Sequence, residues 1–284
     1  MKYAIIDIGS NSVRLMLWAD GKTLYKRVAT TRLGEGIAGG VLQEKPMERT
    51  ARAIAEYATA AFSEGAEVYA FATAAVRAGK NGSDFCARVK RLCGLDIDVV
   101  SGEEEAQLAV LGALGDKDGG IIDIGGASTE VCARKGQSTS FSVSLPVGAV
   151  RLFDACADDK IKLESAIEGA IAPLKGVSFG GTVYAVGGTA STLASLKAEL
   201  TYYNASLLQH LPLTAEWVRE TVQKLLCLTG EERGRLKGMD PARADIIAGG
   251  ALLLHKIMEK LSLAEVHFSD SDNLEGYLLL RGLI

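Results

Sequence analysis

The sequence has few of the residues that most often carry nucleophilic or metal chemistry. Its 284 residues include only three histidines and five cysteines. No two cysteines have the CxxC spacing, and no two histidines have the spacing of a pair of metal ligands. An odd number of scattered cysteines is typical of reduced thiols, and this pattern argues against a structural zinc site or a Ser-His-Asp triad.

An excess of positive charge and a long apolar run are also missing. The formal net charge is −4, which argues against a general nucleic-acid binder, so a polyanionic substrate would need a local positive site. No apolar run reaches the roughly 18 residues that indicate a membrane helix, and the start, MKYAIIDIGS, does not resemble a signal segment. We expect a cytoplasmic protein that binds neither nucleic acid nor membrane.

What the sequence does contain is a motif that occurs twice. The segment 5–12, IIDIGSNS, returns as segment 121–128, IIDIGGAS. Each copy is a β-branched run, then an aspartate, then a turn of small residues. A buried strand that ends in such a turn can hold a phosphate and the cation that accompanies it. Two copies predict two similar lobes that share one phosphate site across a cleft.

The expected strands and helices follow the same order in each half. We predict an α/β protein of two lobes, residues 1–117 and 118–284, with the boundary in the polar, turn-rich segment that ends at Gly120. The last expected helix, Asn273–Leu280, belongs to the second lobe by sequence but is a candidate to pack back on the first. The segment 241–260 is expected to be helical throughout.

The repeated motifs supply the first candidate site residues. Asp7 and Asp123 have two interpretations: an Asx-turn, or a carrier of a hydrated divalent cation, which the repetition favours. The small residues of the two turns are candidates to bind phosphate through backbone N–H groups and hydroxyls. These residues are Gly9, Ser10, Asn11 and Ser12 in the first turn, and Gly125, Gly126, Ala127 and Ser128 in the second.

Other candidates lie outside the repeat. Arg77 is expected at a strand end, where a guanidinium suits a phosphate. Gly187, Gly188 and Thr189 follow a strand and begin a helix, a position that suits a phosphate or nucleotide. Glu103, Glu104 and Glu105 open another helix, where Ser101 and Glu104 have capping-box spacing, so helix stabilisation and catalysis both remain open. Glu130, after the second turn, is by itself typical of a solvated strand residue.

Together these blocks resemble the exopolyphosphatase and guanosine pentaphosphate phosphatase family, within the sugar kinase–Hsp70–actin superfamily. The similar blocks occur in family order along nearly the whole chain. They are DIGSNSVRL from Asp7, TAAVR from Thr73, SGEEEA from Ser101, DIGGASTE from Asp123, LPVGAVRL from Leu145, VGGTA from Val186, and RAD from Arg243 with Gly249-Gly250. The resemblance implies two actin-like, ribonuclease H-like lobes of mixed sheets flanked by helices, with the active site between them.

The resemblance also implies a role for each matching residue. Glu105 is expected to be the general base that activates water. Asp7, Asp123 and Glu130 are expected to hold Mg²⁺, with Mn²⁺ as the alternative metal. The turn residues and Arg77 are expected to bind phosphate, and homodimerisation is left open.

Three departures from the family pattern qualify these expectations. Ala127 replaces a glycine of the second turn, and would cost about 1 kcal/mol if a positive φ were needed there. The C-terminal block 272–276 lacks the family's arginine. The chain also ends without the helical extension of longer members, which places binding of long polymers in question.

The expected activity is hydrolysis of the terminal phosphoanhydride of inorganic polyphosphate. The closest alternative is removal of the γ-phosphate of guanosine pentaphosphate, because both substrates end in the same bond. An actin-like ATPase or sugar kinase, with ATP bound at the 187–189 segment, and a non-catalytic sensor are weaker alternatives. The SGEEEA block argues against an ATPase or sugar kinase, and the intact carboxylates argue against a non-catalytic sensor.

Overall fold

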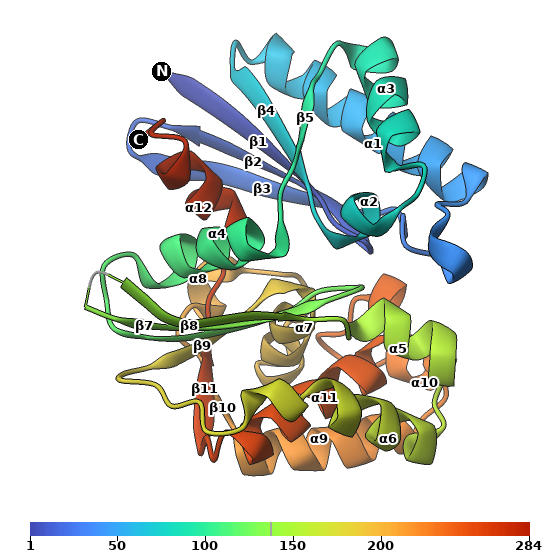
Figure 1. The fold of residues 1–284 in the computed structure, drawn as a ribbon, viewed down its shortest axis with the longest axis vertical. Helices are drawn as coiled ribbons and strands as arrows, with labels where there is room; N and C mark the ends of the chain where they lie inside the picture. Colours follow the sequence, from blue (N-terminus) through green and yellow to red (C-terminus); the bar gives the residue numbers. More distant parts are fainter. Residues whose placement is uncertain (137) are drawn as a thin grey trace. The chain divides into compact units, whose positions relative to one another are not determined.

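A computed structural model describes residues 1–136 and 138–284. The chain forms two compact units, one made of residues 1–108 and 273–284 and the other of residues 109–272. The last helix of the chain, α12 (Asn273–Leu280), therefore belongs to the first unit (Figure 1). No helix in the described part of the chain has the length and apolar character needed to span a membrane.

The first unit is built on a five-stranded mixed sheet with the order β3-β2-β1-β4-β5. β1, β2 and β3 are antiparallel neighbours, whereas β4 and β5 run parallel to β1. This is the ribonuclease H-like order that the resemblance implies. The strands are β1 (Lys2–Ile8), β2 (Ser12–Ala19), β3 (Lys22–Thr30), β4 (Glu67–Ala72) and β5 (Ile97–Val99).

Helices cover both faces of this sheet because side chains of β1 alternate between the two faces. Ala4, Ile6 and Ile8 are fully buried in the cluster that includes the apolar side of α1 (Glu44–Ser63). Tyr3 and Ile5 point the other way and pack with α12 (Figure 1). The remaining helices are α2 (Ala74–Ala78), α3 (Gly82–Cys93), the start of α4 (Gly102–Leu114) and a 3₁₀ turn (Ala38–Gly40).

The contact between α12 and the sheet is aromatic. The rings of Tyr277 and Phe71 are stacked, with centroids 4.9 Å apart. Tyr277 also donates its hydroxyl proton to Asp98, which Arg281 binds at 2.8 Å. Burial and the Asp98 carboxylate raise the pKa of Tyr277 to about 12. These interactions attach the C-terminal helix to β4 and β5, although about 180 residues separate them in sequence.

The second unit repeats the strand order of the first. Its six-stranded sheet has the order β10-β11-β9-β6-β7-β8, so β8-β7-β6-β9-β11 corresponds to β3-β2-β1-β4-β5 and β10 is an added edge strand. The predicted α/β fold with two similar mixed sheets is therefore confirmed. The strands are β6 (Gly119–Ile124), β7 (Thr129–Lys135), β8 (Ser138–Leu145), β9 (Val183–Val186), β10 (Pro212–Thr214) and β11 (Glu265–Phe268).

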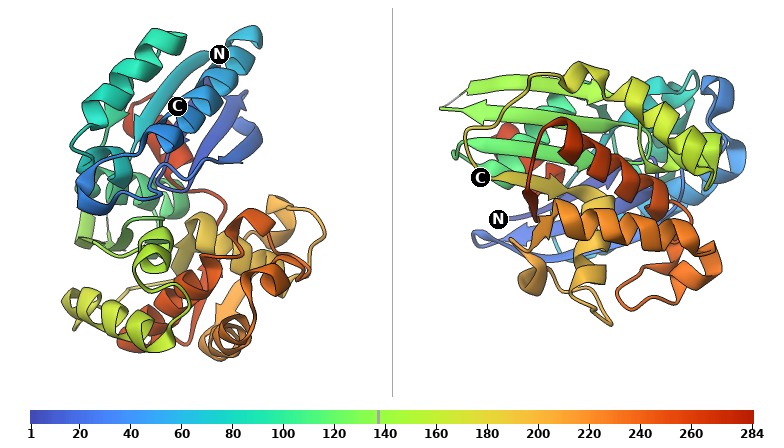
Figure 2. Two further views of the ribbon diagram at one scale, coloured as in Figure 1. Left: turned by 90° about the vertical axis from the view of Figure 1, so that its right-hand side faces the viewer. Right: turned by 90° about the horizontal axis from the view of Figure 1, so that it is seen from below.

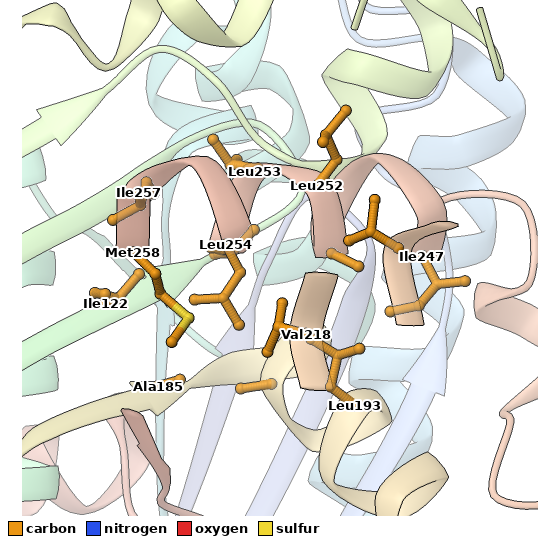
Figure 3. Packing of buried hydrophobic residues seen from close by; sticks show 14 of the residues in the cluster. Ile122, Ala185, Leu193, Val218, Ile247, Leu252, Leu253, Leu254, Ile257 and Met258 are labelled. Atoms are coloured by element: carbon orange, nitrogen blue, oxygen red, sulfur yellow. The ribbon is translucent and has the colours of Figure 1, made fainter. Parts of the chain in front are cut away.

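The core of the second unit lies between this sheet and α11 (Ile247–Lys260). Seen from below, α9 (Ala215–Cys227) and α11 run side by side across one sheet face (Figure 2). Leu253, Leu254 and Ile257 of α11 pack with Ile122 of the central strand (Figure 3). The other helices are α5 (Ala149–Cys156), α6 (Lys160–Ala170), α7 (Gly187–Lys197), α8 (Ala205–Leu208) and α10 (Gly230–Gly234), with 3₁₀ turns at Ala172–Leu174 and Pro241–Arg243.

Two local expectations were wrong. Segment 241–260 is not one helix: a 3₁₀ turn covers Pro241–Arg243 and α11 begins only at Ile247. Asp240 caps that turn by accepting from the Ala242 amide, which favours a short separate turn. Arg77 was expected at a strand end, but β4 ends at Ala72 and Arg77 lies in the short helix α2, residues 74–78.

Candidate active site

The two repeated turns have the same backbone geometry. The Gly9 amide donates to the Ser12 carbonyl at 3.0 Å, and the Gly125 amide donates to the Ser128 carbonyl at 3.0 Å. Each turn joins the two central antiparallel strands of its sheet, β1 to β2 and β6 to β7. The sequence repeat is therefore also a structural repeat.

A neighbouring segment orients the peptide units of each turn. Gly34 donates its amide to the Ser10 carbonyl at 2.8 Å, and Thr31 and Arg32 donate theirs to the Asn11 carbonyl. A planar trans peptide points its C=O and N–H in opposite directions, so these bonds aim the following N–H groups away from the 31–34 segment. Amide groups held in this way are suited to bind an anion.

The second turn is supported in the same way. Val150 and Arg151 donate their amides to the Gly126 carbonyl, at 2.9 and 3.0 Å, and Ala149 donates to the Gly125 carbonyl. The Arg151 side chain adds a bond to the Ala127 carbonyl at 2.9 Å. Ala127 does not have a positive φ, so the alanine causes no backbone strain here.

The acidic residues of the two repeats have different cross-strand neighbours. Asp7 lies opposite Arg14 in the β1–β2 register, and Arg14 donates from both Nε and Nη2 to Oδ2 of Asp7, the Nε bond measuring 2.9 Å. Asp123 lies opposite Glu130 in the equivalent β6–β7 register. One repeat therefore pairs its aspartate with a cation, whereas the other pairs it with a second carboxylate.

The acidic pair of the second unit is buried. Asp123 is 6% exposed and Glu130 is 1% exposed, and Ser144 donates to Oε1 of Glu130 at 2.6 Å. Cys132 lies near both, and burial together with these carboxylates raises the pKa of its thiol to about 12. Two buried like charges side by side disfavour each other unless a proton or cation lies between them. The donors are the hard oxygens that Mg²⁺ prefers, so this pair fits a divalent cation.

The start of α7 lies against this pair. Gly187 has φ +77°, and a Cβ there would lie 2.4 Å from Oδ1 of Asp123, so only glycine leaves room for the carboxylate. At Gly188 a Cβ would lie 1.8 Å from Nη1 of Arg243. Thr189, the third predicted residue, is buried. Gly187 and Gly188 are therefore placed next to Asp123 and to the guanidinium of Arg243, which the candidate set did not include.

The first unit brings Glu105 and Arg77 together. Nη1 of Arg77 donates to Oε2 of Glu105 and to the Val100 carbonyl, both at 2.9 Å. Glu105 is 6% exposed. Burial raises the pKa of Glu105 above the ordinary value of 4.5, and the Coulombic effect of Asp7 adds to this rise, whereas Arg77 and Thr73 oppose it. A carboxylate with a raised pKa is suited to accept a proton near neutral pH.

The three glutamates of the SGEEEA block have different environments. Glu104 accepts from the Ser101 amide at 2.8 Å, and its own amide donates to the Ser101 hydroxyl at 3.1 Å, which confirms the capping box. Hydrogen bonds from Ser101 to the Glu104 carboxylate, that of the Ser101 amide first, lower the pKa of Glu104. Glu103 and Glu104 are exposed, and only Glu105 is buried. The structure thus distinguishes the helix-capping glutamate from the enclosed one.

The predicted site residues are divided between the units. Asp7, the 9–12 turn, Arg77 and Glu105 belong to the first, and Asp123, the 125–128 turn, Glu130 and the 187–189 segment belong to the second. Among the described residues, neither unit by itself gathers three His, Cys, Asp or Glu side chains in a metal-binding group. The expected trio of Asp7, Asp123 and Glu130 draws on both units and stays a prediction.

Sequence reasoning left Arg14 and Arg243 out of the candidate site. Arg14 had a usable signal, because it follows Asp7 by the same seven residues that separate Glu130 from Asp123. Arg243 begins the RAD block of the family resemblance, but its position beside Gly188 could not be read from the sequence, since 55 residues separate the two (243 minus 188).

Comparison with known proteins identifies the group to which this architecture belongs. The model of the Ppx/GppA phosphatase family matches residues 18–281. The chain belongs to the Ppx/GppA phosphatase family. The predicted resemblance is thereby confirmed, and the family supports phosphatase chemistry.

Individual relatives agree over nearly the full length. The chain is 28% identical to exopolyphosphatase 2 of Mycobacterium tuberculosis, over 98% of both chains. It is 30% identical to exopolyphosphatase 1 of Mycobacterium bovis, over 99% of this chain and 88% of that one. The crystal structure of the Aquifex aeolicus Ppx/GppA family member superposes with a TM-score of 0.82 at 30% identity, over 100% of this chain and 98% of that one.

Proposed function

We propose that this Ppx/GppA family member is an exopolyphosphatase that hydrolyses the terminal phosphoanhydride of inorganic polyphosphate. The observation that carries the proposal is the buried, Arg77-bound Glu105, in a unit whose 9–12 turn is held by backbone bonds from residues 31–34. The relatives named as exopolyphosphatases support the choice of substrate.

In this proposal Glu105 orients a water molecule and accepts its proton as the water oxygen attacks the terminal phosphorus. The bond from that phosphorus to the bridging oxygen breaks, which releases orthophosphate and a chain one phosphate shorter. Arg77 holds Oε2 of Glu105 in place. Nε and Nη2 of Arg77 have no hydrogen-bond partner among the described residues, so they are available to a phosphate oxygen.

Asp123 and Glu130 would hold a magnesium ion, which when bound neutralises phosphate charge. Gly187 keeps the space beside Asp123 open for this purpose. Asp7 differs, because Arg14 already neutralises it; its contribution as a metal ligand requires Arg14 to release Oδ2. The two turns would supply N–H donors to the phosphoryl oxygens. Most of the rate acceleration would come from positioning and charge neutralisation.

The test is phosphate release with magnesium, from long-chain polyphosphate and from guanosine pentaphosphate in parallel. Glu105→Gln should lower kcat by at least about 100-fold, because it removes the general base. Glu104→Gln is the matched control: it lies on the same helix and a glutamine at this position can still complete the capping box, so stability stays near wild type and activity within a few-fold. Release from the nucleotide alone would reassign the chain as a guanosine pentaphosphate phosphatase. Wild-type rates in the Glu105 variant would refute the mechanism.

A further inference from the structure

Three neighbouring strands of the second unit each place one polar side chain in a single row. Asp123 of β6 lies directly opposite Glu130 of β7, and Glu130 lies directly opposite Ser144 of β8. Directly opposed residues of antiparallel strands point to the same face of the sheet, with Cβ atoms about 4.5–5.5 Å apart. The acidic pair is therefore continued by a hydroxyl on the outermost strand, β8 (Figure 1).

The serine at the end of this row binds the carboxylate in its middle. Ser144 donates its hydroxyl proton to Oε1 of Glu130 at 2.6 Å. This distance lies in the range of about 2.5–2.7 Å that is typical of a hydroxyl bound to a charged oxygen. Ser144 is exposed, whereas Glu130 is buried. The last side-chain torsion of a glutamate has a broad distribution, so this bond fixes the plane of a buried carboxylate that could otherwise rotate.

The backbone of Ser144 lies in a regular and well-anchored part of the sheet. The next residue, Leu145, is buried and pairs with Thr129 of β7. Thr129 also donates from Oγ1 to the Val147 carbonyl at 2.7 Å, which ties the end of β8 to the start of β7. The irregularity in the β7–β8 register comes only after Ala133. A donor on such a rigid element can hold a ligand side chain in a defined position.

The matching row of the first unit has a different composition. It consists of Asp7, Arg14 and Val28, in the same order across β1, β2 and β3. Arg14 neutralises Asp7 directly, and Val28 has no polar side-chain atom. In the second unit Glu130 takes the place of the arginine and Ser144 takes the place of the valine. The hydroxyl thus accompanies the change from an ion pair to a pair of carboxylates that fits a divalent cation.

We propose that Ser144 is a positioning residue that orients Glu130 as a ligand of this cation. The inference rests on the proposed function and deepens it, because it names what arranges the acidic pair before the cation binds. Ser144 acts through Glu130 and contacts neither the cation nor the phosphate. Partners that hold a metal-ligating side chain in this way contribute about 10–100-fold to metal affinity.

The test is Mn²⁺ binding to the free enzyme, measured by EPR, because this readout needs neither substrate nor turnover. Ser144→Ala should raise the Kd for Mn²⁺ about tenfold, at the lower end of the range for such partners because one neutral hydroxyl is lost. Ser144→Thr keeps a hydroxyl donor and should bind Mn²⁺ within about threefold of wild type. Asp123→Asn removes a ligand and should abolish this binding, which identifies the site that is measured.

Ser142→Ala is the matched control. Ser142 is exposed, lies two residues before Ser144 on the same face of β8, and contacts Sγ of Cys132 at 3.6 Å. Its removal should leave Mn²⁺ binding and Tm near wild type. In phosphate release, Ser144→Ala should need about tenfold more Mg²⁺ for half-maximal rate, while kcat at saturating Mg²⁺ and KM for polyphosphate stay within about twofold.

The other outcomes separate the positioning role from the proposed function. An unchanged Kd for Mn²⁺ in Ser144→Ala, or an equal rise in Ser142→Ala, would overturn the role of Ser144 while exopolyphosphatase activity stands. A higher KM for polyphosphate with an unchanged Kd would make Ser144 a substrate contact, and a wild type that binds no Mn²⁺ would leave it no ligand to orient; both overturn the proposal. If the Kd shifts as expected and no polyphosphate is hydrolysed, the proposed function fails and the positioning role stands.

Discussion

Replacing Gly187 by alanine tests whether the position of Asp123 matters for the reaction. Gly187 has φ +77°, and a Cβ there would lie 2.4 Å from Oδ1 of Asp123, well inside normal contact. The positive φ alone costs an alanine about 1–2 kcal/mol. The carboxylate must also move by about 1 Å to restore contact, and a displacement of that size in a catalytic group lowers rates by about 100-fold.

The matched control is Gly176→Ala in the same unit. Gly176 has φ +83°, and a Cβ there would meet nothing within 4 Å, so only the backbone cost remains. Gly176→Ala should lose about 1–2 kcal/mol of stability in urea titrations, and Gly187→Ala should lose more because the Asp123 carboxylate must also move. Phosphate release should fall about 100-fold in Gly187→Ala and stay near wild type in Gly176→Ala. Equal activities in the two variants would refute the role assigned to Asp123.

Three further predictions concern titration and reactivity. Arg77→Gln removes a cation that lowers the pKa of Glu105, so the acidic limb of the kcat/KM profile should move to higher pH; an unmoved limb would show that another group titrates. Burial raises the pKa of Glu105 in the folded state. As pH rises, the unfolded chain therefore loses this proton at a lower pH than the folded protein does. Wild-type stability relative to Glu105→Gln should therefore fall as pH rises from about 4.5 through the folded-state pKa, which urea titrations at several pH values would detect. A thiol reagent should label exposed Cys227 quickly in the native protein and leave Cys132 unlabelled until urea unfolds it, because the pKa of Cys132 is about 12; fast labelling of Cys132 would contradict its burial.

Some features were readable from the sequence because they depend on neighbouring residues. The small-residue turn after each repeated strand and the capping box at Ser101 and Glu104 are local, and the structure confirms both. Repetition of the strand–turn–strand motif also allowed the two similar sheets to be predicted, since equal local patterns fold into equal units.

The tertiary structure decided what each functional group contacts. Glu103, Glu104 and Glu105 have nearly the same local sequence, and only packing buries the third and brings Arg77 to it from 28 residues away. Asp7 and Asp123 end similar strands, yet the facing strand supplies an arginine to one and a glutamate to the other. Charge environment and burial depend on residues distant in sequence, so the local motif determined where the candidate groups lie along the chain, and the fold determined which of them are buried and what each one contacts.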